Sequence, residues 1–134
     1  MSLKSIILHD FSSLSYIIYK ITFFLFGCTV PPSAQLGQRV NFGHPIGIVI
    51  HQDAIIGDGT IIYQNVTIGR KDRLAQSCPV VGENCVIGAG ACLLGDIMIG
   101  NNVSIGANAV VLRSIPDDCI AVGVPAKIYK KNEG

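Results

Sequence analysis

Aliphatic side chains recur at every sixth position over most of residues 30–116. The longest unbroken run consists of Val81, Ile87, Leu93, Ile99, Ile105 and Val111. Earlier runs keep the same spacing, at Val30, Leu36 and Phe42 and again at Ile50, Ile56, Ile62 and Ile68. This period is neither the 3.6-residue repeat of an amphipathic helix nor the alternation of a half-buried strand. It predicts short flat strands joined by tight turns, three of which close one triangular coil of about 18 residues in a stacked β-solenoid. We therefore expect Val81 to stack on Ile99, Ile87 on Ile105, and Leu93 on Val111.

The period is broken at two places, and such breaks indicate loops on the outside of a solenoid. The step from Phe42 to Ile50 is eight residues, and the two extra residues fall around Gly43, His44 and Pro45. The step from Ile68 to Val81 is thirteen residues, so residues 69–80 are predicted to leave the coil as a polar outside loop. Because functional residues gather on loops held by a rigid scaffold, both breaks are candidate functional segments.

The two ends of the chain depart from the repeat. Residues 14–26 predict a helix that is apolar on nearly every side, within an apolar segment at residues 4–27. This run is shorter than the roughly 18 to 20 apolar residues that span a bilayer. We expect the helix to pack against the solenoid or a neighbouring subunit, and docking on a membrane surface is the open alternative. The expected organisation is an N-terminal apolar helical segment (1–28) and a repeat domain (29–134) whose last part (117–134) caps the final coil.

Composition narrows the class of protein. The chain has 134 residues, enough for one domain, of which 49% are hydrophobic and 14% are charged. That balance excludes a disordered chain, and a net charge of +1 gives no reason to expect nucleic acid. Low charge together with 15 glycines suggests a surface largely covered by copies of the same chain. Five cysteines without a CxxC pair, and no visible signal peptide, favour reduced thiols in a cytoplasmic protein.

The six-residue repeat, the outside loop and the ending at residues 122–127 together resemble the hexapeptide-repeat acyltransferases. The likeness extends over residues 30–130 and is greatest to the serine acetyltransferase branch, whose order is followed by residues 47–50, 54–58, 64–69 and 86–97. The resemblance implies a mainly β fold, a left-handed parallel β-helix. It also implies a homotrimer with active sites between subunits, and acetyl transfer from acetyl-CoA without a metal. The handedness comes from the resemblance alone, since general crossover rules favour right-handed connections.

His44 is the candidate general base. An alcohol that attacks a thioester must lose its proton as the bond forms, and histidine suits this role because it titrates near neutral pH. His44 lies on the two-residue insertion and falls where the resembled family has its catalytic histidine. His51, by contrast, lies inside a regular repeat, where we expect its side chain to point outward. The family's orienting aspartate corresponds to Thr29 here, so the group that orients His44 is not identified.

The same resemblance implies residues for the thiol donor. Ala89 and Ala107 would contact the pantetheine arm through backbone groups. Gly69 would lie near the thioester, where an N–H can stabilise the oxyanion. Arg113 and Lys127 would contact phosphates.

The acceptor site departs from the family pattern. The family's serine-binding arginine and second histidine would fall near Ser77 and Cys78, where no cation is present to hold a carboxylate. Arg70 and Arg73 in the same loop could compensate, so these four residues are the candidate acceptor-binding residues. Residues 42–50 also resemble sugar O-acetyltransferases of surface-polysaccharide clusters. The favoured acceptor is therefore a sugar hydroxyl of a cell-surface polysaccharide or its precursor, with serine O-acetylation for cysteine biosynthesis as the alternative.

Two other classes of function compete on the same scaffold. A zinc-dependent lyase would need three histidines gathered across an interface, and only His44 and His51 lie within the repeat. A non-catalytic trimeric assembly module would use the repeat for association alone and dock a partner through residues 4–27.

Overall fold

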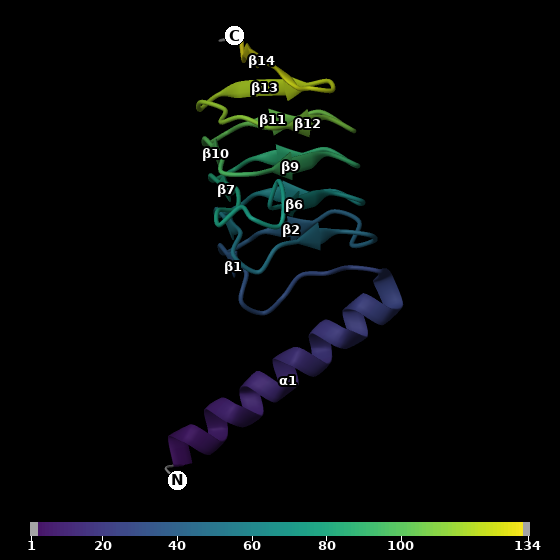
Figure 1. Cartoon of the computed structure of the whole chain (residues 1–134), viewed down its shortest axis with the longest axis vertical. Helices are drawn as coiled ribbons and strands as arrows, with labels where there is room; N and C mark the ends of the chain where they lie inside the picture. The colour runs from purple at the N-terminus through teal and green to yellow at the C-terminus, as the bar shows by residue number, and fades with distance from the viewer. Residues whose placement is uncertain (1–2, 133–134) are drawn as a thin grey trace.

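The computed structural model describes residues 3–132, and the side chains from residue 13 onward. A single helix, α1 (Leu3–Phe26), is followed by short strands that wind into a column with three flat faces (Figure 1). The first face contains β1 (Gln35–Leu36), β4 (Ile55–Ile56), β7 (Val80–Val81) and β10 (Met98–Ile99). The second contains β2 (Asn41–Phe42), β5 (Ile61–Ile62), β8 (Val86–Ile87), β11 (Ser104–Ile105), β13 (Cys119–Val122) and β14 (Lys127–Lys130). The third contains β3 (Val49–Ile50), β6 (Thr67–Gly69), β9 (Cys92–Leu94) and β12 (Val110–Val111). The six-residue period therefore builds the three-sided parallel solenoid that it predicts.

The stacking register follows the sequence period. Ile99 pairs with Val81, Ile105 with Ile87, and Val111 with Leu93, each in a parallel ladder. All three predicted stacks are confirmed. The longer step between Ile68 and Val81 leaves this register intact, because residues 70–79 leave the coil and β7 still pairs in parallel with β4.

The core is a column of the repeating aliphatic side chains. Ile62, Ile87 and Leu93 are completely buried, as are most of their equivalents in neighbouring coils. Burying one such side chain stabilises the fold by roughly 1.5–3 kcal/mol. The first coil is less well covered: Leu36 keeps 38% of its surface exposed, because a coil at the end of a solenoid has a neighbour on one side only.

Tight corners between the faces require small residues at defined positions. A Cβ atom on Gly88 would lie 2.7 Å from the backbone nitrogen of Ala107 in the next coil, so only glycine fits there. Asn65 and Asn108 take positive φ angles of 58° and 59° at equivalent corners, which asparagine tolerates better than most residues. The coils can therefore stack at close range along this edge.

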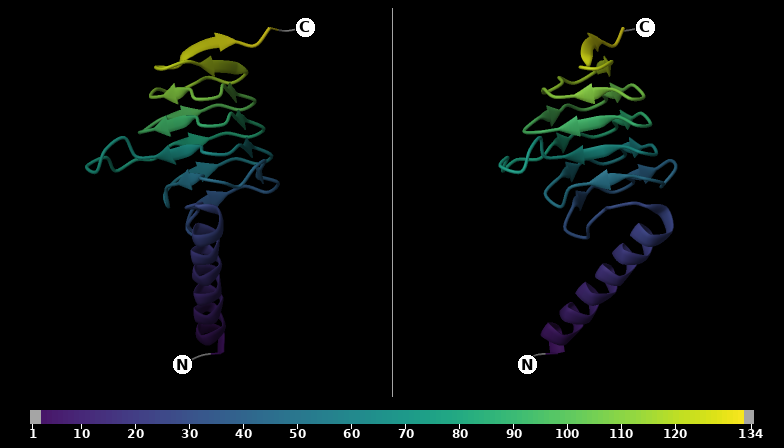
Figure 2. Two further views of the ribbon diagram at one scale, coloured as in Figure 1. Left: turned by 90° about the vertical axis from the view of Figure 1, so that its right-hand side faces the viewer. Right: turned by 45° about the vertical axis from the view of Figure 1, so that its right-hand side comes forward.

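The helix is longer than the expected 14–26, since it begins at Leu3. It ends where Gly27 adopts a φ of 64° and donates its N–H to the carbonyl of Phe23 at 2.9 Å. Figure 2 shows that it extends away from the N-terminal end of the column. Among the residues that the structure describes, no helix combines the length and apolar character needed to cross a membrane. At the other end of the column, β14 turns back antiparallel on β13.

Candidate functional site

The candidate base lies on the corner that joins the second face to the third. Backbone hydrogen bonds stack the successive corner turns on one another: Asn65 N–H donates to the carbonyl of Ile46 at 2.9 Å, and Gly90 N–H to that of Gln64 at 2.9 Å. Asn108 N–H then donates to the carbonyl of Ala89 at 2.8 Å. The turn that carries His44 therefore lies on the same edge as Ala89 and Ala107. We call this edge, formed by residues 43–48, 63–66, 88–91 and 106–109, the histidine edge.

His44 is exposed and its ring lies beside an aromatic side chain. The ring centroids of His44 and Tyr63 are 6.3 Å apart, within the range of favourable aromatic pairs. A Cβ atom at Gly43 would lie 2.9 Å from the Tyr63 ring, so glycine at this position makes room for the tyrosine. Among the side chains of residues 13–132, none forms a hydrogen bond with the imidazole of His44. Sequence reasoning missed Tyr63, which occupies an ordinary repeat position.

The predicted acceptor loop leaves the opposite edge of the third face. His44 precedes β3, whereas Gly69 ends β6, and these two strands are parallel neighbours. The residue before one strand and the residue after the other must therefore lie at opposite ends of the sheet. A single chain thus brings His44 together with Ala89 and Ala107, but not with Gly69 or the loop candidates.

The loop candidates are two cations, a serine and a buried thiol; Arg73 is exposed, whereas Arg70 is half-buried. Arg70 and Arg73 line a cavity of about 490 Å³ together with His51 and Asp72. Ser77 is half-buried and does not line that cavity. Cys78 is buried, with 8% of its surface exposed. Burial raises the pKa of its thiol above the usual 9.0, and the nearby Arg70 guanidinium only partly offsets this effect.

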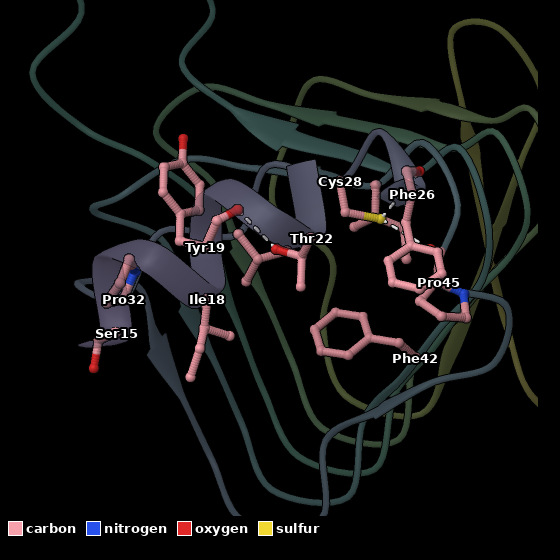
Figure 3. A pocket seen from close by; sticks show the side chains of 11 residues that line it. Ser15, Ile18, Tyr19, Thr22, Phe26, Cys28, Pro32, Phe42 and Pro45 are labelled. Carbon is pink, nitrogen blue, oxygen red and sulfur yellow. Dashed lines mark hydrogen bonds between the residues drawn. The ribbon is translucent and has the colours of Figure 1, made fainter. Parts of the chain in front are cut away.

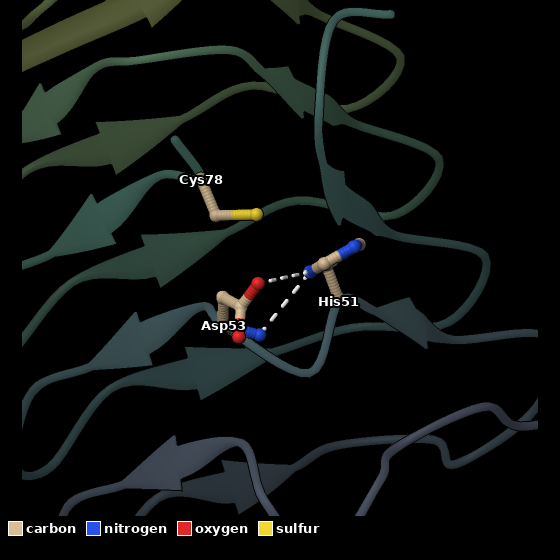
Figure 4. Close-up of side chains that lie close together, drawn as sticks. All are labelled: His51, Asp53 and Cys78. Atoms are coloured by element: carbon tan, nitrogen blue, oxygen red, sulfur yellow. Dashed lines mark hydrogen bonds and ion pairs between the residues drawn. The ribbon is translucent and has the colours of Figure 1, made fainter. Parts of the chain in front are cut away.

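A second histidine, His51, lies in a polar cluster at the base of this loop (Figure 4). The N–H of Asp53 donates to His51 Nδ1 at 3.1 Å, and Asp53 Oδ2 lies 3.7 Å from the same nitrogen. Arg70 Nη2 donates to that carboxylate oxygen at 2.8 Å. The ligand-type atoms of His51, Asp53 and Cys78 lie within 4.8 Å of one another. They do not suit a metal ion, because Nδ1 already accepts an N–H and the guanidinium already neutralises the carboxylate.

Two further cavities contain residues predicted from the sequence. A groove of about 260 Å³ on the third face is lined by Thr29, His51 and Gly69 among others. A cavity of about 380 Å³ near the C-terminal end is lined by Arg113 and Lys127 together with residues 124–126. The two predicted phosphate-binding cations therefore lie around one cavity.

An apolar cavity of about 480 Å³ separates α1 from the first coil (Figure 3). The helix lines it with Ile18, Thr22 and Phe26, and the first coil lines it with Phe42 and Pro45. The thiol of Cys28 anchors the turn after His44 by donating to the carbonyl of Pro45 at 3.1 Å.

Comparison with known proteins agrees with this architecture. A family model described as "Bacterial transferase hexapeptide (six repeats)" matches residues 78–113. The serine acetyltransferase of Synechococcus elongatus is 44% identical over 109 residues, which cover 81% of this chain and 45% of that protein. That of Staphylococcus xylosus is 43% identical over 121 residues, which cover 89% of this chain and 56% of that protein.

Solved structures give the same result. The serine acetyltransferase of Neisseria gonorrhoeae superposes with a TM-score of 0.85 at 33% identity, covering 95% of this chain and 49% of that one. A serine acetyltransferase in complex with CoA superposes with a TM-score of 0.79 at 38% identity, covering 87% of this chain and 48% of that one.

The chain therefore contains hexapeptide repeats at residues 78–113, and its fold is the expected left-handed parallel β-helix. Within that class, it is similar to the serine acetyltransferase-like branch, as its sequence motifs indicate. The chain spans about half the length of the curated relatives that it matches.

Proposed function

We propose that this chain is an acetyl-CoA-dependent O-acetyltransferase that uses His44 as its general base. The observation that carries the proposal is the histidine edge, where the His44 turn stacks in line with Ala89 and Ala107. The imidazole of His44 is exposed, and the corner residues Ala89 and Ala107 on the same edge are small, which leaves room for an extended thioester. The similarity to serine acetyltransferases, one of them in complex with CoA, supports the same chemistry.

The proposed acceptor is L-serine. The sequence alone favoured a sugar hydroxyl, but the relatives at 43–44% identity are named serine acetyltransferases and favour the alternative. The sugar acceptor has no specific support among them. Arg70 and Arg73 around one loop cavity supply the cations that positions 77 and 78 lack, so recognition of a carboxylate is chemically reasonable.

The proposed reaction is direct transfer. His44 removes the proton of the acceptor hydroxyl as its oxygen attacks the acetyl carbon. The tetrahedral oxyanion is stabilised by the N–H of Gly69, and the CoA thiolate leaves with the proton returned by the imidazolium. Arg113 and Lys127 bind the CoA phosphates around their shared cavity. Among residues 13–132, whose side chains the structure describes, no carboxylate orients His44, so its proposed orienter is a backbone carbonyl, a water molecule or a neighbouring subunit.

The proposed assembly is a homotrimer with its active sites between subunits. Support comes from the separation of the two halves of the site within one chain, His44 at one edge of the third face and Gly69 at the other. A neighbouring copy that presents its Gly69 edge to the histidine edge would complete the site. Docking of residues 4–27 on a membrane surface or a partner stays a prediction.

Release of free CoA thiol from acetyl-CoA in the presence of L-serine tests the proposal. We expect the His44→Ala variant to lose roughly 100- to 10,000-fold in kcat while it still binds CoA, because the base acts on the acceptor and not on the donor. Near-normal thiol release by this variant would show that His44 is not the base. A wild-type protein that binds no CoA at millimolar concentration would favour the assembly module.

A further inference from the structure

The turn after β3 fixes the protonation pattern of His51. The backbone N–H of Asp53 donates to His51 Nδ1 at 3.1 Å, the same pattern by which asparagine and aspartate side chains accept the N–H two residues on. A nitrogen that accepts an N–H carries no proton itself. The neutral imidazole therefore bears its hydrogen on Nε2, which makes that nitrogen a donor and excludes it as a base.

The neighbouring side chains hold the ring in this orientation. Asp53 Oδ2 lies 3.7 Å from Nδ1 and is itself bound by Arg70 Nη2 at 2.8 Å. Only 28% of the His51 side chain is exposed, and 31% of the Arg70 side chain. Rotation of the ring would break the bond to Asp53 N–H, so the direction of Nε2 is fixed before any ligand arrives.

The other ring nitrogen, Nε2, points away from the cluster, and His51 lines two hollows. Figure 4 shows both dashed lines ending on Nδ1, while the other ring nitrogen faces away from Asp53 and Cys78. His51 lines both the groove that contains Gly69 and the cavity that contains Arg70 and Arg73. It is the residue that these two hollows share.

The donors around His51 suit a negatively charged oxygen ligand. The guanidinium of Arg70, whose Nη2 binds Asp53, lines one of these hollows together with the guanidinium of Arg73. Asp53 and Asp72 offset part of this charge, so a small anion fits better than a polyanion. Cys78 is buried and offers no donor to such a ligand, which leaves the Nε2–H of His51 and the guanidinium groups of Arg70 and Arg73 as the donors here.

We propose that His51 is an acceptor-binding residue whose Nε2–H donates a hydrogen bond to a carboxylate oxygen of the acceptor. This inference rests on the proposed acetyl transfer and names the recognition chemistry of that same site. His44 would remove the proton of the hydroxyl, whereas His51 would hold the carboxylate between the hollow that contains Gly69 and the one that contains Arg70. The two histidines thus have opposite roles, one as a base and one as a donor.

Two conservative variants separate binding from a structural role. The amide oxygen of His51→Asn can still accept the N–H of Asp53, but no donor remains at the Nε2 position. The amide nitrogen of His51→Gln restores that donor and gives up the local acceptor. With L-serine as the probe, we expect His51→Asn to raise the KM for L-serine about 10- to 100-fold, the size expected for one hydrogen bond to a charged group. We expect the KM for L-serine of His51→Gln to stay within about 3-fold of the wild-type value, because this variant keeps a donor for the carboxylate.

The KM for acetyl-CoA and the thermal unfolding temperature are measured on the same variants. A donor role in acceptor binding leaves the KM for acetyl-CoA unchanged in both. A wild-type KM for L-serine in His51→Asn, or an equal rise in the KM for acetyl-CoA, would overturn the inference. Wild-type protein that releases no thiol with L-serine would instead refute the proposed serine acceptor, which is a separate outcome.

Discussion

The middle coils and α1 are both rich in aliphatic and aromatic side chains, yet they differ sharply in burial. Ile87 and Leu93 in the coils are completely buried, whereas Phe24 in α1 is 86% exposed. In the coils, the aliphatic side chain at every sixth position turns inward and meets its equivalents above and below. Along residues 13–26 of α1, most apolar side chains stay exposed, and the first coil covers only one side of this part of the helix. Periodicity, more than hydrophobic content, decides what a single chain can bury.

This contrast can be tested first in the core. We expect Leu93→Ala to lower the free energy of unfolding by about 2–5 kcal/mol, because it leaves a cavity in a close-packed column. Chemical denaturation at fixed protein concentration measures the change. A loss below about 1 kcal/mol would mean that the coils relax around the cavity, contrary to the rigid stacking described here.

The polar exception inside the column gives a second test. Among the described residues, one polar side chain is completely buried, that of Thr60. Its hydroxyl donates to the carbonyl of Gly82 at 3.0 Å and accepts the N–H of Cys85 at 3.2 Å. Thr60→Val keeps the shape and leaves both groups unpaired. We expect a loss of about 1–3 kcal/mol in the free energy of unfolding, measured in the same way. Thr60→Ser, which keeps the hydroxyl, is the control and should lose less.

The pH dependence of the free energy of unfolding tests the burial of Cys78, which lies where the exposed loop returns to the buried column. Its pKa is raised by burial, so the folded protein holds this proton more tightly than the unfolded chain does. The free energy of unfolding should therefore decrease as the pH rises above the ordinary thiol pKa of 9.0. In Cys78→Ala, this decrease should be smaller. The measurement covers roughly pH 8 to pH 10, the range around the ordinary thiol pKa in which the difference between folded and unfolded protein matters. An identical pH profile in the variant would show that the thiol is not protected.

The smallest effect is expected on the exposed side of α1. We expect Phe24→Ser to change the free energy of unfolding by no more than about 0.5 kcal/mol, because the side chain buries little surface within the chain. The comparison with Leu93→Ala is made under identical conditions. A loss as large as that of Leu93→Ala would mean that α1 is buried against another copy, and the loss would then depend on protein concentration.

Much of the fold was predictable because one rule repeats. The six-residue period gives the inward positions, and the two breaks in it give the outside segments that carry His44 and the loop. The length of α1 was underestimated because its first half is less uniformly apolar than residues 14–26.

The candidate site was predictable only in part. Ala89 and Ala107 fall on the edge of His44 because all three occupy equivalent corners of the period. The His51 cluster was missed because His51 and Cys78 are far apart in the sequence, and only the return of the loop brings them together. The packing of Tyr63 on Gly43 was missed for the same reason, since it joins two different coils.

The central claim is that His44 of one subunit and the Gly69–Arg70 edge of a neighbour form one site, and mixed trimers test it most directly. His44→Ala and Arg70→Ala chains are unfolded together, refolded at equal concentration and assayed for L-serine-dependent thiol release. In a cyclic trimer, random mixing leaves about one interface in four with both residues intact, so we predict recovery of about a quarter of wild-type activity. Activity no higher than that of the two separate variants would contradict the claim.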